Sequence, residues 1–221
     1  MNPQNRRQIL MKSQNSACII LLFFLICSLL VFPVISFGQD TERDDTLKPY
    51  TSCHFDNGLR IIQIDSLPKN VKSRPIKTAK GNKKVSLADG YRIMVSYKNS
   101  SDWFANIKAE KSFAADYEQD KENVIENLKW TTSNEKGMES QDPIKVNFNG
   151  YEGYKINRQT LTGNILGVYV LFSDAEHTIT TIYFINQNPK NKRFQRIEEW
   201  QTLRDEFLIS YTGCINQNRK S

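Results

Sequence analysis

Histidine is scarce in this chain, because His54 and His177 are the only two among 221 residues. A zinc site needs three or four ligands, usually histidine or cysteine at short spacing. Neither histidine has a second ligand at such a spacing: His54 has only Cys53 beside it, and His177 lies at an expected turn. We expect both to be surface or turn residues, and we predict no metal site.

Catalytic motifs are also missing. The sequence contains no Gly-x-Ser-x-Gly motif, no glycine-rich phosphate loop and no cysteine that we expect to be free. Carboxylate pairs of the glycosidase kind meet in space and not at a fixed spacing, but most carboxylates here fall on polar helix faces, in the early polar segment and in loops. We predict that the protein is not an enzyme and has no catalytic or cofactor-binding residues.

Acidic residues are absent from positions 1–38, where Arg6, Arg7 and Lys12 precede the apolar run Ala17–Ile35. A basic start followed by an apolar run is typical of a secretory signal peptide. Small residues just before Gln39 offer a cleavage site. We expect residues 1–38 to be a signal peptide.

The alternative is an uncleaved membrane anchor over residues 17–35, because a run of this length can span a bilayer. Lipid attachment is not expected, since Cys27 follows Leu25 and Ile26 and not small residues. In both alternatives the basic residues hold the start of the chain in the cytoplasm. The domain is therefore expected to be extracytoplasmic, either periplasmic or secreted, or anchored with the domain outside.

A strong basic bias is missing once the signal is set aside. The chain has 30 basic and 24 acidic residues, and three of the basic residues lie in the signal, which leaves 27 against 24 and a net charge of +3. Nucleic-acid binding domains carry a larger basic excess. Together with the export signal, this charge predicts no nucleic-acid partner.

Cysteine is rare, and two of the four cysteines lie in the signal. Cys53 and Cys214 remain, in a compartment where disulfides form and persist. We predict that they form a disulfide, which would stabilise the fold by roughly 5 kcal/mol in the chain-entropy model. Two unpaired buried thiols are the alternative.

Residues 39–84 are expected to form a polar lead with one short strand and a basic connector. Residues 39–50 are polar without periodicity, and Asn57-Gly58 introduces the apolar run Leu59–Ile64, which is typical of a strand. After Pro68, prolines and a glycine predict a connector without regular structure. Its cations could contact an anionic membrane surface or polyanion, and a solvated connector is the alternative. These cations are Lys69, Lys72, Arg74, Lys77, Lys80, Lys83 and Lys84.

Regular patterns begin at residue 85, and we expect residues 85–214 to form a single domain, followed by a polar tail over 215–221. Apolar and polar residues alternate over Tyr91–Lys98 and less strictly over Phe104–Lys111, as in half-buried strands. An amphipathic helix is expected over Phe113–Trp130.

Four strands and a closing helix complete the domain. The strands are expected over Ile144–Phe148, Tyr151–Thr160, Ile165–Phe172 and Thr178–Ile185, with Asn149-Gly150 as a type I′ turn. A helix over Phe194–Tyr211 carries an apolar stripe, and Gly213 is expected to stop it. Short connections make the strands antiparallel. The order predicts an α+β fold with a mostly antiparallel sheet of about six to seven strands and two packed helices.

Three features between Gly90 and Tyr211 carry a resemblance to a known family. They are the element order over Ala105–Asn157, the hairpin sequence Tyr151-Glu152-Gly153-Tyr154, and the closing helix with Arg204-Asp205-Glu206-Phe207. This stretch resembles the PsbP-like fold of the photosystem II extrinsic subunit, and small exported bacterial domains of unassigned function. The resemblance implies a PsbP-like sandwich and a non-catalytic role as accessory subunit, adaptor or envelope protein, and it names no site.

We predict an exported, non-enzymatic module, monomeric and without a cofactor, that binds a protein or another envelope component. A carrier of a small apolar or lipid ligand and an exported immunity or inhibitor protein stay open as alternatives. Exposed aromatic side chains could anchor a partner, with core packing as the other explanation. The candidates are Trp103, Phe104, Tyr151, Tyr154 and Tyr169.

Overall fold

The computed structural model describes residues 45–55, 58–67, 73–99, 103–133, 142–159, 165–185 and 197–220. The predicted signal peptide, the alternative anchor over residues 17–35, and the cations Lys69 and Lys72 lie outside this part of the chain. Within it, no helix is both long and apolar enough to cross a membrane. All described residues belong to one compact unit, Arg43–Ser221.

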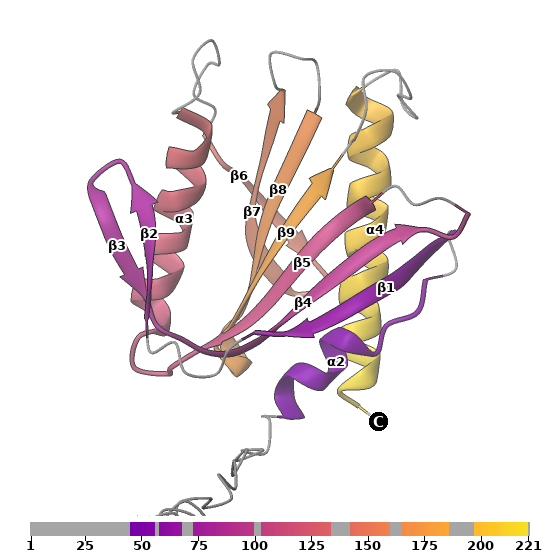
Figure 1. The fold of residues 1–221 in the computed structure, drawn as a ribbon, viewed down its shortest axis with the longest axis horizontal. Coiled ribbons are helices and arrows are strands. Elements are labelled where there is room, and N and C mark those ends of the chain that lie inside the picture. The colour runs from indigo at the N-terminus through magenta and orange to yellow at the C-terminus, as the bar shows by residue number, and fades with distance from the viewer. Residues whose placement is uncertain are drawn as a thin grey trace, which may run out of the picture. The chain divides into compact units, whose positions relative to one another are not determined.

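The main sheet has seven antiparallel strands in the order β1-β4-β5-β9-β8-β7-β6 (Figure 1). At the predicted type I′ turn between β6 and β7, Asn149 and Gly150 have positive φ angles of 54° and 92°. The predicted α+β class and antiparallel pairing are confirmed, but the described residues form three α-helices and not the predicted two. The strands are β1 (Leu59–Ser66), β4 (Leu87–Tyr97), β5 (Trp103–Ser112), β6 (Ile144–Phe148), β7 (Tyr151–Gln159), β8 (Ile165–Ser173) and β9 (Thr178–Ile185).

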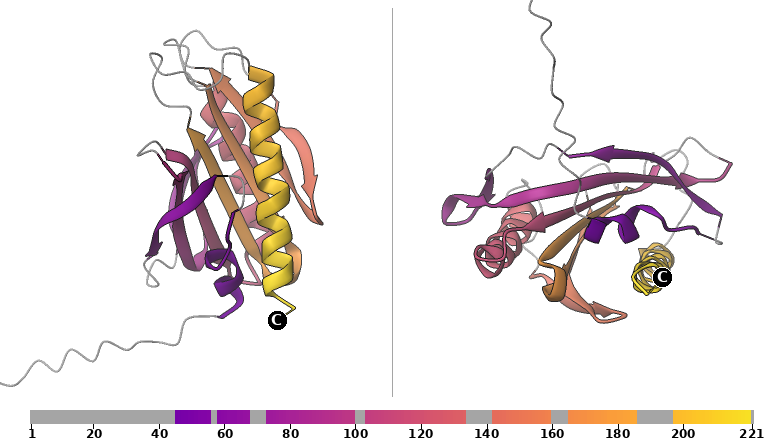
Figure 2. Two further views of the ribbon diagram at one scale, coloured as in Figure 1. Left: turned by 90° about the vertical axis from the view of Figure 1, so that its right-hand side faces the viewer. Right: turned by 90° about the horizontal axis from the view of Figure 1, so that it is seen from below.

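Helices cover both faces of this sheet (Figure 2). The long helix α4 (Ile197–Asn218) and the short α2 (Lys48–Thr51), which follows η1 (Asp45–Leu47), pack on one face. Helix α3 (Tyr117–Ser133) packs on the other. Strand β8 serves both layers, because its side chains alternate: Tyr169 points toward α4 and Val170 toward α3.

Phe104 of β5 lies at the centre of the α4 layer. Its ring contacts those of Trp200 and Phe207 on α4, with centroids 5.6 Å and 5.1 Å away, and that of Phe184 on β9 at 5.3 Å. All three contacts are edge-on, which is the favoured geometry of aromatic pairs. The apolar stripe predicted for the last helix therefore builds the larger core.

The basic connector is an ordered hairpin, and the expectation of no regular structure there is wrong. Strands β2 (Arg74–Thr78) and β3 (Gly81–Val85) pair around a turn in which Gly81 has a φ of 99°. Alternation places Ile76 and Val85 against α3 and leaves Pro75 outward, where its missing N–H is tolerated. The hairpin and β1 are parts of the domain, which therefore does not begin at residue 85.

Gly213 does not stop the last helix, contrary to the prediction. Helix α4 continues to Asn218, and Ile215 in the expected polar tail is buried. Tertiary contacts hold the extra turns: the Asn216 side chain donates to the Asn149 carbonyl over 3.0 Å, and that of Asn218 to the Pro49 carbonyl over 3.3 Å. Helix α3 also begins at Tyr117, four residues later than expected.

The predicted disulfide is confirmed. Cys53 follows α2 and Cys214 lies on α4, and the bond joins them with a Cα–Cα distance of 5.8 Å. Cys53 is buried in the core beneath α4. The bond fastens the first described segment to the last helix, and it is consistent with an oxidising, extracytoplasmic compartment.

Candidate functional site

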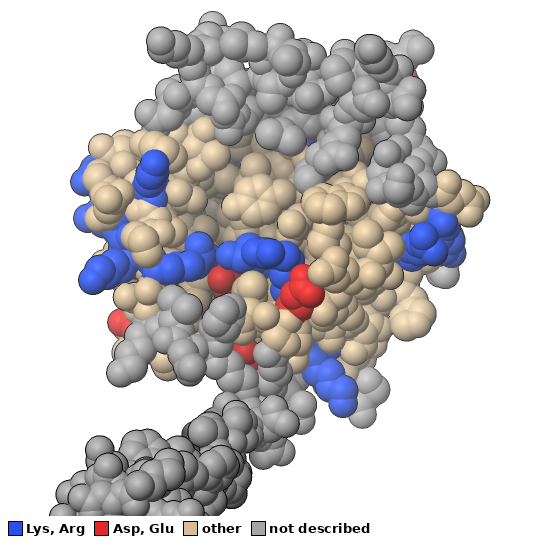
Figure 3. All heavy atoms as spheres, viewed as in Figure 1, with Lys and Arg blue, Asp and Glu red and all other residues tan. Residues whose placement is uncertain are grey.

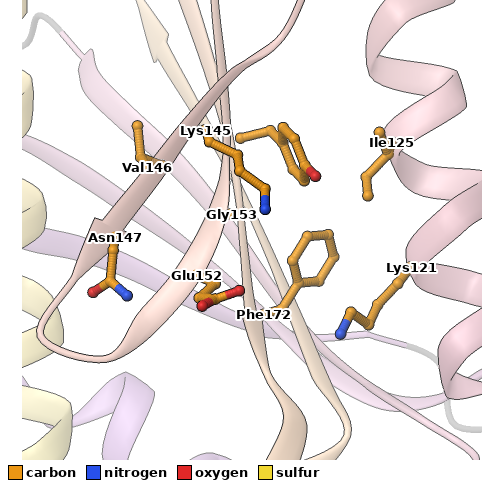
Figure 4. Close-up of a pocket in the computed structure, with 9 residues that line it drawn as sticks. Lys121, Ile125, Lys145, Val146, Asn147, Glu152, Gly153 and Phe172 are labelled. Atoms are coloured by element: carbon orange, nitrogen blue, oxygen red, sulfur yellow. The ribbon is translucent and has the colours of Figure 1, made fainter.

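A cleft of 390 Å³ opens between α3 and the β6–β7 hairpin (Figure 4). This volume lies in the range of small-molecule sites. The cleft combines charged side chains with aliphatic and aromatic ones. Its lining residues are Lys121 and Ile125 of α3, Lys145, Val146 and Asn147 of β6, Glu152, Gly153 and Tyr154 of β7, and Phe172 of β8.

Local periodicity brings these side chains together. Lys121 and Ile125 are four residues apart on α3 and therefore share one helix face. Lys145 lies opposite Tyr154 in the β6–β7 register, so both project from the same face of the sheet. Glu152 is two residues before Tyr154 and projects the same way. The turn at residues 149–150 sets the register that makes this wall.

Lys121 is held in place by acids and aromatic rings. Its ammonium donates to Asp174 Oδ1 over 2.8 Å and lies 5.2 Å and 5.4 Å from the ring centroids of Tyr117 and Phe172. Burial opposes its charge, but the hydrogen bond and charge of Asp174, together with Glu118, outweigh burial and raise the pKa of Lys121. Lys121 is therefore charged at neutral pH and fixed in position.

Lys145 and Glu152 are exposed charges without such partners. Neither forms an ion pair or a side-chain hydrogen bond within the described residues. Figure 4 shows Lys145 reaching from β6 and Lys121 from α3, on either side of Phe172. The Lys145 ammonium is therefore available to an anionic group that enters the cleft.

The arrangement suits a ligand with two unlike parts. An anionic group would meet Lys145, while Phe172, Tyr154 and Ile125 offer apolar contact to the rest of the molecule. The carboxylate of Asp174 already neutralises much of the attraction of Lys121. Glu152 would repel a second anionic group, so the site favours one.

A second polar cluster joins α2, α4 and the short helix η2 (Asp174–Glu176). Arg219 donates to Glu176 and, over 2.9 Å, to Tyr50 Oη. Tyr50 Oη also donates to Glu176 Oε2 over 3.1 Å. The Arg219 guanidinium lies over the ring of Tyr151, whose pKa burial raises to about 12. Every charge is compensated, so the cluster holds the start of the domain to its end.

The cations of the predicted basic segment contact several different groups of the protein itself. Lys80 forms an exposed ion pair with Glu126 of α3 at 2.6 Å, and the Lys77 ammonium lies 5.4 Å from the Trp130 ring centroid. Both contacts fasten the hairpin to α3. Whether the segment meets an anionic partner stays a prediction. The described members of the seven are Arg74, Lys77, Lys80, Lys83 and Lys84.

Arg74 belongs to another basic row that the sequence did not suggest. It pairs with the buried Glu110 of β5 at 2.7 Å, and Lys108 lies 3.3 Å from the same carboxylate. Figure 3 shows Lys and Arg in a row across this face, with acidic side chains among them. Burial lowers the pKa of Lys108, while Glu110 opposes that shift. The single carboxylate of Glu110 thus offsets part of the positive charge of Arg74 and Lys108.

The two histidines occupy the positions expected of them. His54 is exposed, and His177 has a φ of 51° at the turn before β9, with its ring 5.2 Å from that of Tyr117. In the described segments, no group of three or more His, Cys, Asp or Glu residues could hold a metal ion.

Most of the aromatic candidates belong to the core. Phe104, Tyr151 and Tyr169 are buried, whereas Trp103 is exposed and Tyr154 lines the cleft. Sequence reasoning therefore named one residue of the cleft without recognising the site. Lys121 and Lys145 carried no signal beyond their place on amphipathic elements, and Phe172 carried none beyond its place in an apolar strand. No family model, curated protein or solved structure matches this chain.

Proposed function

We propose that the protein is a non-enzymatic binding module of the cell envelope whose cleft takes a small ligand with one anionic group beside an apolar body. The observation that carries this proposal is Lys145, an unpaired ammonium facing Phe172 across an open cleft. The cell-envelope location draws support from the disulfide and from the export signal expected over residues 1–38.

A ligand with an anionic group fits the cleft better than a purely apolar one. An apolar cargo would leave the ammonium and carboxylate groups of Lys145 and Glu152 next to hydrocarbon, which is costly unless both turn to solvent. An anion instead gains a charge-assisted hydrogen bond from Lys145, and the aromatic wall at Phe172 adds contact area. If the protein is a carrier, its ligand is therefore an amphipathic anion and not a purely apolar molecule.

The PsbP-like sandwich is part of the same proposal. Two observations support it: the order of the elements from β4 to α4, and the packing of helices on both faces of an antiparallel sheet. The resemblance favours an accessory role over catalysis. Under this proposal, ligand capture in the cleft serves a partner process, with no chemistry at the bound molecule.

Ligand-observed NMR with the full-length chain tests the cleft. The probes are small aromatic and aliphatic carboxylates and, as neutral counterparts, their primary amides. We expect the carboxylates to bind about 10-fold to 100-fold more tightly than the amides, because a hydrogen bond to a charged group contributes about 1.5–3 kcal/mol. Lys145→Gln should remove this preference.

Lys98→Gln is the matched control, because Lys98 is an exposed lysine in the turn after β4, outside the cleft. Equal binding of acids and amides, or equal losses in the two variants, would refute the cleft as an anion site. Turnover of any substrate in a broad hydrolase screen would refute the non-enzymatic part of the proposal.

A further inference from the structure

Strand β1 forms one edge of the seven-stranded sheet, next to β4 (Figure 1). Within the described segments, no strand pairs with its outer side. An edge strand presents backbone N–H and C=O groups that can pair with another strand. β1 also carries two of the large apolar side chains that face solvent, Ile62 at 42% and Ile64 at 44% exposure.

A bulge at Ile62 changes which side chains share a face. Ile61 pairs with Val95 and Gln63 with Met94, so Ile62 is an extra residue in β1. Side chains five positions apart normally point to opposite faces of a sheet. Because of the bulge, Arg60 and Asp65 project from the same face, opposite Ser96 and Arg92 of β4.

Arg60 and Asp65 make this edge complementary to itself. Neither forms an ion pair within the described residues, although the Asp65 carboxylate accepts hydrogen bonds from Gln63 at 3.0 Å and 2.9 Å. Two copies of β1 can pair antiparallel with Arg60 of the first copy opposite Asp65 of the second. The two-fold axis then also places Asp65 of the first copy opposite Arg60 of the second. The same register places Ile61 opposite Ile64 of the second copy.

In place of the monomer expected from the sequence, we propose that two copies of this chain associate through β1, antiparallel and in this register, which joins their sheets into one. A two-fold axis makes such an interface isologous, with the same patch on both copies. Opposite charges across strands stabilise the pairing, whereas a register with Arg60 opposite Arg60 is disfavoured. The two bulges meet at the axis, between Ile62 and Gln63.

The other edge strand lacks this complementarity. β6 is five residues long, with the sequence Ile-Lys-Val-Asn-Phe. Its only charged residue is Lys145, and a lysine on a short edge strand discourages pairing. The β1 dimer leaves Lys145 and its cleft at the far end of the strand order. Dimerisation and ligand binding can therefore fail independently.

Sedimentation velocity of the full-length chain over a concentration series tests the dimer. The wild type should self-associate, and Arg60→Asp and Asp65→Arg should each weaken association at least about tenfold, because each puts like charges opposite one another. The double variant with both substitutions restores opposite charges and should regain the wild-type constant. An equimolar mixture of the two single variants should form the mixed dimer.

Lys98→Asp is the control, because it changes an exposed charge outside β1 and should leave association unchanged. A wild type that stays monomeric up to about 1 mM, the weakest end of specific association, would overturn the proposal. So would single variants that associate poorly but neither pair with each other nor recover in the double variant. Circular dichroism confirms that each variant is folded.

Discussion

At the scale of single residues, Gly153 and Gly213 differ in the space that is available for a Cβ atom. A Cβ at Gly153 in β7 would lie 2.0 Å from the Val170 carbonyl oxygen of the neighbouring strand. A Cβ at Gly213 in α4 would meet nothing closer than the Asn149 amide nitrogen at 3.4 Å. The first position has no space for a methyl group, whereas the second has enough.

Alanine substitutions at these glycines should change stability in opposite directions. Gly153→Ala should cost about 1–3 kcal/mol or more, because the strands must move apart. Gly213→Ala should stabilise by up to about 1 kcal/mol, because alanine is the better residue inside a helix. Denaturant unfolding of both variants measures the two changes. A loss at Gly213→Ala as large as that at Gly153→Ala would contradict the continuation of α4 through this residue.

At the scale of elements, the disulfide between Cys53 and Cys214 holds α2 against α4 across a sequence separation of 161 residues. Replacing both cysteines by alanine should lower the free energy of unfolding by up to roughly 5 kcal/mol in the chain-entropy model. The loss should be smaller to the extent that other contacts remain, such as the hydrogen bond of 2.9 Å from Tyr211 Oη to the Tyr50 carbonyl.

Chemical denaturation of the double variant and of the oxidised wild type measures this loss. The reduced wild type is the control and should unfold like the double variant. If reduction leaves the unfolding midpoint unchanged, the bond does not stabilise the contact between these two helices.

At the scale of the whole molecule, buried tyrosines make the fold sensitive to alkali. Burial raises the pKa of Tyr50, Tyr169 and Tyr211 above the ordinary value of 10.0. Below a pH of 10.0 the phenols are neutral in the folded and the unfolded chain, so their ionisation does not lower the free energy of unfolding. Above that pH the unfolded chain loses protons that the folded chain keeps, and each tyrosine lowers the free energy of unfolding by about 1.4 kcal/mol per pH unit.

We therefore expect cooperative unfolding as the pH rises above 10.0. Tyrosinate absorbance and circular dichroism followed together should change in one transition, because these phenols ionise only when the core opens. If all the tyrosines titrated near the ordinary value while the circular dichroism stayed native, the burial of these side chains would be contradicted.

Local patterns predicted most of the fold because they depend on neighbouring residues. The turn residues Asn149-Gly150 predict the hairpin and the apolar stripe of α4 predicts the buried face of that helix, and the structure follows both. Alternation predicted the strand β4 but not its burial, because Met94 and Ser96 are buried as well as Ile93 and Val95. The disulfide followed from the small number of cysteines. The charge and proline content of residues 74–85 wrongly predicted a connector without regular structure. The β2–β3 hairpin forms because packing of Ile76 and Val85 against α3 outweighs that local preference.

The α+β class, the antiparallel pairing and the Cys53–Cys214 bond could all be predicted from the sequence, because they depend on periodicity, turn residues and the number of available thiols. Packing brings Lys121 and Lys145 to one cleft on either side of Phe172, and it places Arg60 and Asp65 on one face of β1. The first arrangement depends on how α3 lies against the β6–β7 hairpin. The second depends on a bulge in β1, and neither the helix packing nor this bulge is encoded in adjacent residues.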